Sequence, residues 1–401
     1  MRKLTILLFA FCFSLVSCTR YYESDPPKPR ADRTVLVYMV ADNILSSFFN
    51  SNIRDMIRGV ADGENLLVYL KAPASGTSKL IKISPDDNAV IPDINNQEVI
   101  KTYNNPDVFS VAFMQGVLND VFTLFPAESY GMVLSSHGMG WQPIGVNIQS
   151  GFRAFMYDDD AMRPEIVTKY FGWNGTSIEI EDIAAALGNN RKFEFLLFDA
   201  CFMATVETYY ELRNTAKYII ASPAEVLGAG FPYEDIVPLF FDKDFSSEAV
   251  CRAFMDFYAL PAHQVYGNPS SVVSYAVTSE MDDLAAVVRQ INASVPEIAS
   301  VAEIQAYEKY LHHIYYDLED YIDKRVSAAS PSLYQVFGAQ FDKAFPPEGR
   351  GCTPSLYGNV PSSGFFTVNA SCGVSTYIRN TSLPQSNAAY ASTSWAVAVA
   401  P

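Results

Sequence analysis

Short apolar runs alternate with segments of helical spacing along the first half of the chain. Apolar runs of about four to eight residues predict strands buried on both faces, and apolar residues three or four apart predict helices that cover a sheet. This alternation is typical of an α/β fold with a mostly parallel sheet. The predicted strands are residues 34–41, 65–70, 80–83, 132–134, 193–198 and 218–221, and the predicted helices are residues 44–60, 107–125 and 202–212.

A cysteine follows one of these apolar runs. The run at residues 193–198 stops at Asp199, and residues 202–212 place Met203, Val206 and Tyr210 near helical spacing. Cys201 is therefore expected at the junction of a buried strand and a helix. Backbone N–H groups at a helix start favour the thiolate, which is the nucleophilic form. The alternative is a buried, unreactive cysteine.

A histidine follows a second run of the same kind. Residues 132–134 are apolar and lead through two serines to His137 and Gly138. Because the carboxyl ends of parallel strands meet at one edge of a sheet, we expect His137 and Cys201 to share a cleft. The chain has four histidines, and His137 is the one that directly follows a predicted strand.

The pair HG after one strand and DAC after another, together with their flanking blocks, resembles the clostripain-like cysteine peptidases of family C11. These are relatives of the caspases, gingipains and legumains. The matching blocks are VLVYMVADNILSSF, DACFMATVETYYEL, SPAEVLGAGFPY, YDLEDYI and CGVSTYI, which extend from Thr34 to about Arg379. HG and DAC are weak patterns singly, but their order and context make the resemblance strong. It implies a caspase-like three-layer α/β/α sandwich with a mostly parallel central sheet and a C-terminal α/β extension.

The resemblance implies peptide hydrolysis by a Cys-His dyad without a cofactor. In this scheme Cys201 is the nucleophile, and His137 protonates the leaving amine and later activates water. Backbone N–H groups of Gly138 and Cys201 would hold the oxyanion. The expected substrate is a peptide or protein.

The loop of residues 222–233 is expected to wall the pocket for the residue that precedes the scissile bond. Its candidate substrate-binding residues are Asp199, Ser222, Glu225 and Ala229. Relatives that cleave after arginine carry an acidic group where this chain has Ala229, so the sequence departs from their pattern there. Asp199 and Glu225 still supply negative charge, and cleavage after Arg or Lys is the expectation.

The first residues resemble a targeting segment. Arg2 and Lys3 precede an apolar stretch, residues 4–16, that is too short to span a bilayer stably, so residues 1–17 are predicted to be a signal peptide. The ending LVSC resembles a bacterial lipobox, which would make Cys18 a lipidated residue; a plain secretory cleavage site is the alternative. Polar residues 18–33 are the expected flexible tether. The protein is expected at the bacterial cell envelope, attached to the membrane through its lipid alone, on either the periplasmic side or the outer-membrane surface.

A long polar insertion, residues 138–176, separates the histidine from the cysteine strand. Long loops of this kind are commonly functional. Some clostripain-like enzymes cut themselves in this region, and Arg153 is the candidate bond here, with an uncut surface loop as the alternative. The run Asp158, Asp159 and Asp160 can hold Ca²⁺ or form a solvated loop. No cluster has the spacing of a zinc site.

Composition and charge agree with a large globular protein. Hydrophobic residues make up 49% of the 401 residues, and the formal net charge of −16 argues against a nucleic-acid partner. We expect a monomer. Outside residues 1–18 the cysteines are Cys201, Cys251, Cys352 and Cys372, and the sequence permits a disulfide between Cys352 and Cys372.

We predict a peptidase core at residues 34–240 and a C-terminal α/β region at residues 241–401 that packs on it. The C-terminal region is predicted to contain a strand at residues 272–278, a helix at 281–298, and further helices to residue 345, including a tyrosine-rich helical segment with His312 and His313. A loop at 346–368, a strand at 373–378 and a helix at 387–399 complete it.

Two functions of different class remain open from the sequence. The first is an active cysteine endopeptidase anchored to a bacterial envelope. The second is a catalytically silent lipoprotein that binds peptides or proteins with the same fold. The presence of both His137 and Cys201 favours the enzyme, because a binding module does not need this pair at matching strand ends. A transpeptidase or legumain-like variant is a third alternative.

Overall fold

The computed structural model describes residues 31–40, 46–72, 75–86, 91–104, 106–142, 178–188, 193–358 and 364–401. The strands are β1 (Ala31–Val40), β2 (Asn65–Lys71), β3 (Thr77–Ile83), β4 (Glu98–Asn104), β5 (Ala127–Ser135), β6 (Phe193–Asp199), β7 (Ala216–Ala221), β8 (Val272–Val277), β9 (Tyr316–Asp317), β10 (Gly351–Cys352), β11 (Ser355–Gly358), β12 (Gly364–Thr367) and β13 (Ser375–Thr376). The α-helices are α1 (Ser46–Gly59), α2 (Val111–Leu124), α4 (Ile180–Leu187), α5 (Val206–Glu211), α6 (Tyr233–Phe241), α7 (Ser247–Ala259), α8 (Met281–Ser294), α9 (Leu318–Val326), α10 (Pro331–Ala344), α11 (Pro384–Ser392) and α12 (Ser394–Ala398). Within these ranges no helix has the length and apolar character that a membrane crossing needs.

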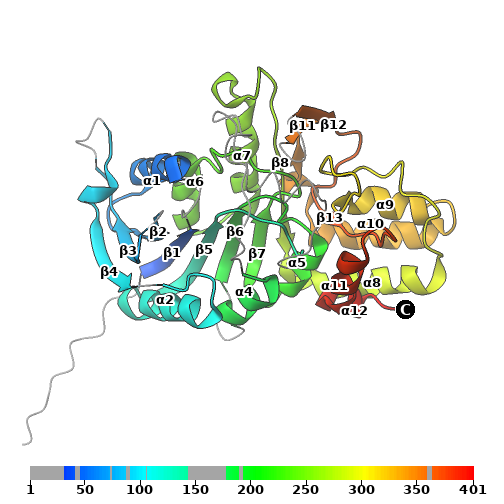
Figure 1. Cartoon of the computed structure of the whole chain (residues 1–401), viewed down its shortest axis with the longest axis horizontal. Helices are drawn as coiled ribbons and strands as arrows, with labels where there is room; N and C mark the ends of the chain where they lie inside the picture. The colour runs from blue at the N-terminus through cyan, green and yellow to red at the C-terminus, as the bar shows by residue number, and fades with distance from the viewer. Residues whose placement is uncertain are drawn as a thin grey trace, which may run out of the picture.

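A nine-stranded sheet forms the centre of the molecule, in the order β10-β8-β7-β6-β5-β1-β2-β3-β4 (Figure 1). The five middle strands, from β7 to β2, pair in parallel, and the strands outside them pair antiparallel. The predicted mostly parallel α/β sheet is therefore confirmed at its centre. The middle strands carry the near-continuous apolar runs that a sheet covered on both faces requires.

Helices cover the sheet on both faces, which confirms the three-layer arrangement. In Figure 1, α1, α6 and α7 lie above the sheet, and α2, α4 and α5 lie below it. Alternate residues of β1 belong to opposite cores: Leu36 and Tyr38 pack with the lower helices, and Val35 and Val37 pack with the upper ones. This alternation is the consequence of the two-residue period of a strand.

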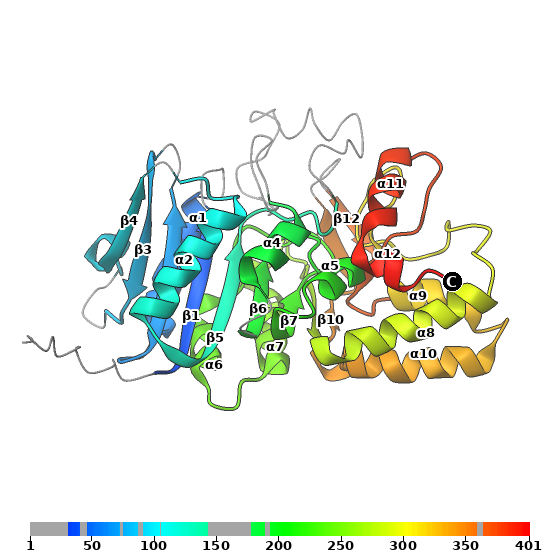
Figure 2. The same cartoon turned by 90° about the horizontal axis from the view of Figure 1, so that it is seen from below.

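The C-terminal region contributes to the central sheet itself. Strand β8 pairs antiparallel with β7, and β10 pairs with β8. The predicted division at residue 240 therefore does not divide the sheet into separate units. Helices α8, α9 and α10 form a group beside the sheet, and α11 and α12 pack against this helix group (Figure 2).

Several C-terminal predictions are wrong in detail. The segment at residues 301–315 with His312 and His313 is irregular and not helical, and residues 346–368 contain β10, β11 and β12. The predicted strand 373–378 is reduced to the two residues of β13. The predicted helix 387–399 is two helices, because Thr393 has extended backbone angles and its side chain caps α12 by accepting the N–H of Ala396.

The first strand begins inside the stretch predicted as tether. Strand β1 starts at Ala31, and the side chain of Arg33 donates to Ser129 Oγ and to the carbonyl oxygens of Phe240 and Asp242. Arg33 thus ties the strand to β5 and to the end of α6. The polar sequence before residue 34 does not indicate these hydrogen bonds, because the partners of Arg33 are distant along the chain.

The four cysteines in the described residues are all free thiols, including Cys352 and Cys372. The disulfide that the sequence permits between these two is not formed. Cys372 is buried and its thiol lies 3.1 Å from the carbonyl oxygen of Val374.

Candidate active site

His137 and Cys201 lie at equivalent positions beyond two adjacent parallel strands. Ser135 of β5 and Asp199 of β6 are register partners, and each candidate residue follows its strand by two positions. The two side chains are therefore at the same edge of the sheet, as the sequence pattern predicted. His137 has no exposed surface and Cys201 is 1% exposed.

The loop after His137 packs directly on the loop that carries Cys201. A Cβ atom at Gly138 would collide with the carbonyl oxygen of Cys201 and would lie 2.9 Å from Met203 Sδ. At Gly140, which has φ +58°, an added Cβ atom would similarly lie 2.7 Å from the carbonyl oxygen of Phe202. Close backbone approach of the two loops is possible because these positions lack side chains.

The structure corrects the predicted helix start at Cys201. Helix α5 begins at Val206, and Thr205 caps it by accepting the N–H of Thr208. Cys201 instead lies in a turn, followed by Phe202 in the left-handed conformation with φ 58°. Such a conformation costs a non-glycine residue on the order of 1 kcal/mol or more, and it is typical of functional sites.

A backbone N–H from another loop takes the place of the expected helix terminus. The N–H of Val226 points at Cys201 Sγ from 3.2 Å. The carbonyl oxygen of the same residue lies 3.7 Å from Sγ, so Val226 offers the sulfur both a donor and an acceptor. We call residues 200–204, which carry Cys201, the nucleophile turn. Two further hydrogen bonds, from Phe202 N–H to Ala224 O and from Ala204 N–H to Ser222 O, hold the loop of residues 222–232 against this turn. No local sequence pattern indicates this contact, because Val226 is 25 residues away from Cys201.

Two buried tyrosines pack against the two loops. The ring of Tyr315 stacks on Phe202 with centroids 4.4 Å apart, and its hydroxyl donates to the carbonyl oxygen of Met139 at 2.8 Å. Tyr310 lies 6.2 Å from the Phe202 ring. Burial, assisted by the nearby carboxylate of Glu308, raises the pKa of both tyrosines, so their hydroxyls stay protonated. Sequence reasoning missed this support.

The carboxylate of Glu308 shapes the irregular segment that carries these tyrosines. Its oxygens accept the N–H groups of Tyr310, Ile314 and Tyr315. The same carboxylate lies 2.8 Å from His313 Nδ1, and this hydrogen bond raises the pKa of His313. His313 is thus hydrogen-bonded to a buried carboxylate.

Asp199, the candidate acidic residue of the substrate pocket, is hydrogen-bonded to side chains of the neighbouring strand and of the pocket loop. Its side chain has no exposed surface, and Oδ2 accepts hydrogen bonds of 2.9 Å from Ser135 Oγ and Tyr233 Oη. Tyr233 ends the loop that begins at Ser222. Asp199 therefore joins β5, β6 and the pocket loop in one network.

The other candidate pocket residues have different surroundings. Ser222 is fully buried, and its hydroxyl bonds to the backbone of Ala224 within the loop. The carbonyl oxygen of Ala229 accepts from Asn52 Nδ2 at 2.7 Å. Glu225 is half-buried and lies beside the β11–β12 hairpin. Of these three residues, Glu225 alone carries a charged side chain.

Lys309 lies next to Glu225, although the sequence did not suggest it. A Cβ atom at Gly358 would lie 3.4 Å from Lys309 Cδ and 3.5 Å from Glu225 Oε1. The two side chains therefore converge on the same point of the hairpin. A positive charge at this place weakens the negative potential that Glu225 offers to a substrate.

Glu207 is a buried carboxylate behind the nucleophile turn. Its Oε1 accepts from Thr376 Oγ1 at 3.0 Å and from the N–H of Tyr377 at 2.9 Å, which joins α5 to β13. Burial raises the pKa of Glu207 from its ordinary value of 4.5 to about 7, although these hydrogen bonds act in the opposite direction.

The pKa of Glu207 predicts a pH-dependent stability. Between pH 4.5 and about 7 the unfolded chain loses the proton that the folded protein keeps, so the free energy of unfolding falls as the pH rises. Relative to Glu207→Gln, the wild type should lose on the order of 3 kcal/mol across this window and no more above it. Urea midpoints of both proteins at pH 4.5, 6 and 8 measure this difference.

Glu303→Gln, which removes an exposed carboxylate, is the control for the Glu207 measurement. It should leave the pH dependence of the wild type unchanged. Parallel curves for the wild type and Glu207→Gln would contradict the assignment.

Three groups of predicted residues lie outside the described residues: Cys18, Arg153 and the run Asp158 to Asp160. In the part of the chain that the structure describes, no cluster of three or more His, Cys, Asp or Glu side chains has the arrangement of a metal site.

Comparisons with known proteins identify related chains. A family model described as the clostripain family matches residues 37–330. Clostripain of Hathewaya histolytica is 24% identical over 231 residues, which are 51% of this chain and 41% of that protein. The chain therefore matches about two fifths of the length of this curated relative.

Two solved structures share the whole fold. One is an inactive zymogen of a C11 protease from Parabacteroides distasonis, with 28% identity, a TM-score of 0.75, and coverage of 93% of this chain and 99% of that chain. The other is a secreted C11 cysteine protease from Bacteroides thetaiotaomicron in complex with an irreversible peptide inhibitor, with 29% identity, a TM-score of 0.75, and coverage of 92% and 99%. The caspase-like fold class predicted from the sequence is confirmed.

Proposed function

Because the chain belongs to the clostripain family, we propose that it is a cysteine endopeptidase that uses Cys201 and His137. One observation carries the proposal: the two residues follow register-paired positions of adjacent parallel strands, and their loops touch at Gly138. The solved relative with a peptide inhibitor supports a peptide as the ligand of this cleft.

In the proposed mechanism the Cys201 thiolate attacks the carbonyl carbon of the scissile bond. A bond forms between sulfur and carbon, and the carbonyl oxygen becomes an oxyanion. When this intermediate collapses, the carbon–nitrogen bond breaks, and His137 gives a proton to the leaving amine. A thioester remains. His137 then removes a proton from water, the water attacks the thioester, and the thiolate is released.

Backbone donors would stabilise the oxyanion in both steps. The N–H groups of Gly138 and Cys201 are the proposed pair, and the contact between their two loops supports this choice. Such donors act in a site closed to water and need no reorganisation during the reaction. The glycine at position 138 leaves the approach to its N–H open on one side.

The proposal is tested with purified residues 19–401 and a panel of fluorogenic peptides that differ in the residue before the cut. We expect hydrolysis, with the highest kcat/KM for peptides that have Arg or Lys at this position, because Asp199 and Glu225 supply negative charge. Mass analysis of the same sample tests self-cleavage after Arg153. A folded protein that binds these peptides without cleaving any of them would favour the silent binding protein.

Lys309 is expected to limit the preference for basic residues. Lys309→Ala removes a positive charge beside Glu225, so kcat/KM for an Arg peptide should rise about two- to fivefold relative to an uncharged peptide. The ratio of the two kcat/KM values is the measurement. Lys343→Ala removes an exposed lysine of α10 and should leave the ratio unchanged. A lower ratio in Lys309→Ala would show that Glu225 does not face the substrate.

Secretion and lipid anchoring through Cys18 are also part of the proposal. The lipobox-like LVSC supports it, and one solved relative is described as secreted. In bacterial cells the full chain should partition into the detergent phase of Triton X-114, and Cys18→Ala should move it to the aqueous phase, because the acyl chains would be missing. Detergent partitioning that Cys18→Ala leaves unchanged would contradict the anchor.

Size-exclusion chromatography of residues 19–401 tests the proposed monomer.

A further inference from the structure

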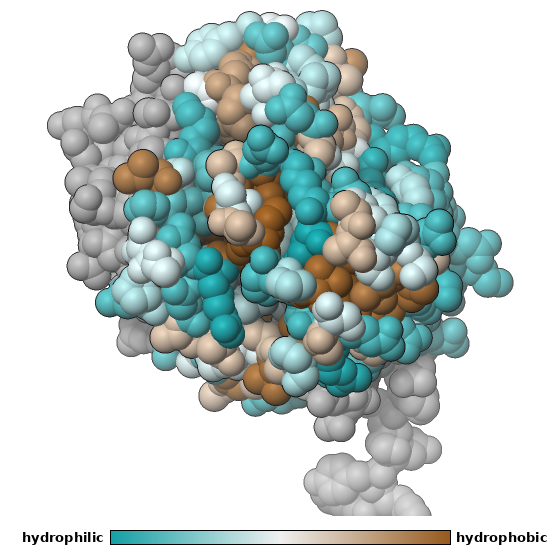
Figure 3. All heavy atoms as spheres, turned by 90° about the vertical axis from the view of Figure 1, so that its right-hand side faces the viewer, coloured by the Kyte–Doolittle hydropathy of each residue, from teal (hydrophilic) through white to brown (hydrophobic). Residues whose placement is uncertain are grey.

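A cavity of about 800 Å³ opens at the C-terminal end of the molecule, among α8, α9, β13 and the helices α11 and α12. Figure 3 faces this end and shows hydrophobic atoms sunk between hydrophilic side chains. The cavity is in the size range of ligand sites, about 300–1,000 Å³. Neither His137 nor Cys201 lines it. Its apolar lining includes Val295, Leu318, Ile322, Ile378 and Trp395.

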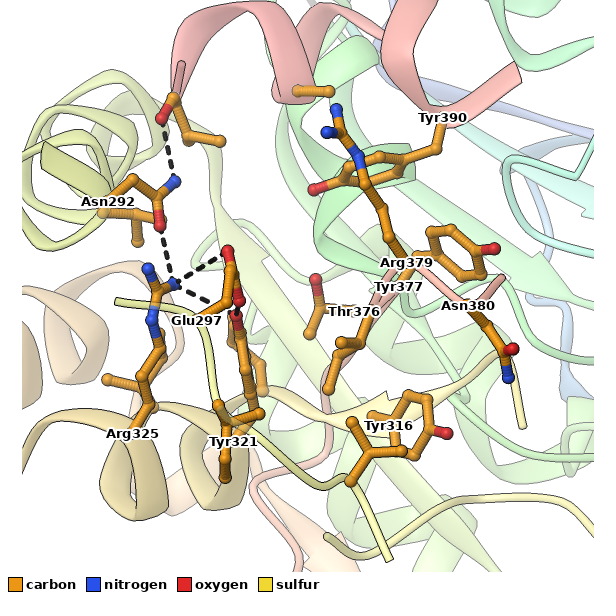
Figure 4. A pocket seen from close by; sticks show the side chains of 18 of the residues that line it. Asn292, Glu297, Tyr316, Tyr321, Arg325, Thr376, Tyr377, Arg379, Asn380 and Tyr390 are labelled. Atoms are coloured by element: carbon orange, nitrogen blue, oxygen red, sulfur yellow. Dashed lines mark hydrogen bonds and ion pairs between the residues drawn. The ribbon is translucent and has the colours of Figure 1, made fainter. Parts of the chain in front are cut away.

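Charged side chains stand on two opposite walls of the cavity (Figure 4). On one wall, the buried Arg325 lies 3.5 Å from Glu297, so its charge is offset. On the other wall, Arg379 is exposed and lies 5.8 Å from the ring centroid of Tyr390. Among the described residues Arg379 has no carboxylate within ion-pair distance. The cavity therefore carries a positive charge beside an apolar floor.

This combination complements a ligand in which an apolar group lies next to a carboxylate. Arginine binds carboxylates through two parallel hydrogen bonds, and such pairs are strong when partly removed from water. The rim adds the amide of Asn380 and the hydroxyl of Thr381, which can pair with backbone groups of a peptide. A fatty acid offers no partner for these groups, so the lining favours a peptide.

The cavity shares a strand with the loop that carries Cys201. Thr376 of β13 lines the cavity, and its neighbour Ser375 donates its N–H to the carbonyl oxygen of Ala204 at 2.9 Å. Thr376 Oγ1 also donates to Glu207 of α5, the helix that follows the nucleophile turn. A ligand that shifts β13 therefore acts directly on the residues next to Cys201.

We propose that this cavity is a second peptide site, separate from the cleft at Cys201. It takes a segment with an acidic residue beside an apolar one, with the carboxylate at Arg379 and the apolar side chain on the floor near Ile378. Occupancy is transmitted through β13 to Cys201. The ligand chemistry is opposite in charge to the basic residues proposed before the cut, so the two sites select different residues.

Binding is tested with the Cys201→Ala protein and the fluorescein-labelled peptide Leu-Leu-Asp-amide, by fluorescence anisotropy. We expect saturable binding that weakens at least about tenfold with Arg379→Gln, or when Asn replaces Asp in the peptide. Arg289→Gln removes an exposed arginine of α8 outside the cavity lining and should bind like the parent. Binding that Arg379→Gln does not weaken, or no binding at peptide concentrations on the order of 1 mM, overturns the site.

Transmission is tested by the rate at which iodoacetamide alkylates Cys201 in the wild type, followed by mass spectrometry of the peptide that contains it. Saturating Leu-Leu-Asp-amide should change this rate on the order of fivefold, and Arg379→Gln should remove the change. A rate unaffected by the peptide overturns transmission through β13. Neither readout depends on peptide hydrolysis, so a failure here is distinct from a failure of the proposed activity.

Discussion

Cys201→Ala is expected to abolish peptide hydrolysis, with a loss in kcat/KM on the order of 10⁴-fold or more. The substitution removes the only atom that can form the thioester, while the turn keeps its backbone hydrogen bonds to the loop of residues 222–232. The measurement is the initial rate on the best peptide of the panel, at enzyme concentrations high enough to detect the residual rate. Intact mass before and after incubation shows whether self-cleavage disappears as well.

Cys251→Ala is the matched control for the nucleophile. Cys251 is 2% exposed in the core between α7 and the sheet, and burial raises the pKa of its thiol well above the ordinary value, so it stays neutral. A neutral buried thiol is a poor nucleophile. The control should keep its peptidase activity. Full activity in Cys201→Ala would refute the proposed chemistry outright.

Gly138→Ala should lower kcat/KM on the order of 100-fold, because displacement of catalytic groups by about 1 Å has an effect of this size. The added methyl group would collide with the carbonyl oxygen of Cys201 and crowd Met203 Sδ. Gly138 does not have a positive φ, so the backbone accepts alanine and the effect is a steric one between the two loops. The kcat/KM of the variant, with the circular-dichroism spectrum as a check of folding, measures it.

Gly116→Ala is the matched control for the glycine substitution. Gly116 lies on the exposed side of α2, where a Cβ atom would meet nothing within 4 Å. Alanine there should stabilise the protein by about 0.5–1 kcal/mol and leave kcat/KM unchanged. If Gly138→Ala kept wild-type kcat/KM, the two loops would not need their close contact for catalysis.

The sequence predicted the buried middle of the sheet best. Strands β1, β2 and β6 are near-continuous apolar runs and β5 contains the short run 132–134, because both faces of a covered parallel sheet exclude water. Strand β4 was missed, since its residues are mostly exposed at the sheet edge and most of them are polar. An edge strand does not need an apolar run, because its backbone pairing with the neighbouring strand is what makes the segment a strand.

The irregular segment at residues 308–315 could not be predicted from periodicity. Its tyrosines suggested a helix, but the buried carboxylate of Glu308 binds three backbone N–H groups and so replaces the hydrogen bonds of a regular helix. A tertiary contact overrides local propensity here, because the stacking of Tyr315 on Phe202 holds the segment against the nucleophile turn.

By itself, the sequence determined that a histidine and a cysteine follow buried parallel strands, and hence that they meet at one edge of the sheet. The family resemblance added their proposed roles. Only the tertiary structure decided what surrounds the thiol: the N–H of Val226 in place of a helix terminus, the glycine contact between the loops, and the proximity of Lys309 to Glu225. These contacts join residues that are far apart along the chain. Tertiary packing determines the distances between them, so a local sequence pattern cannot predict them.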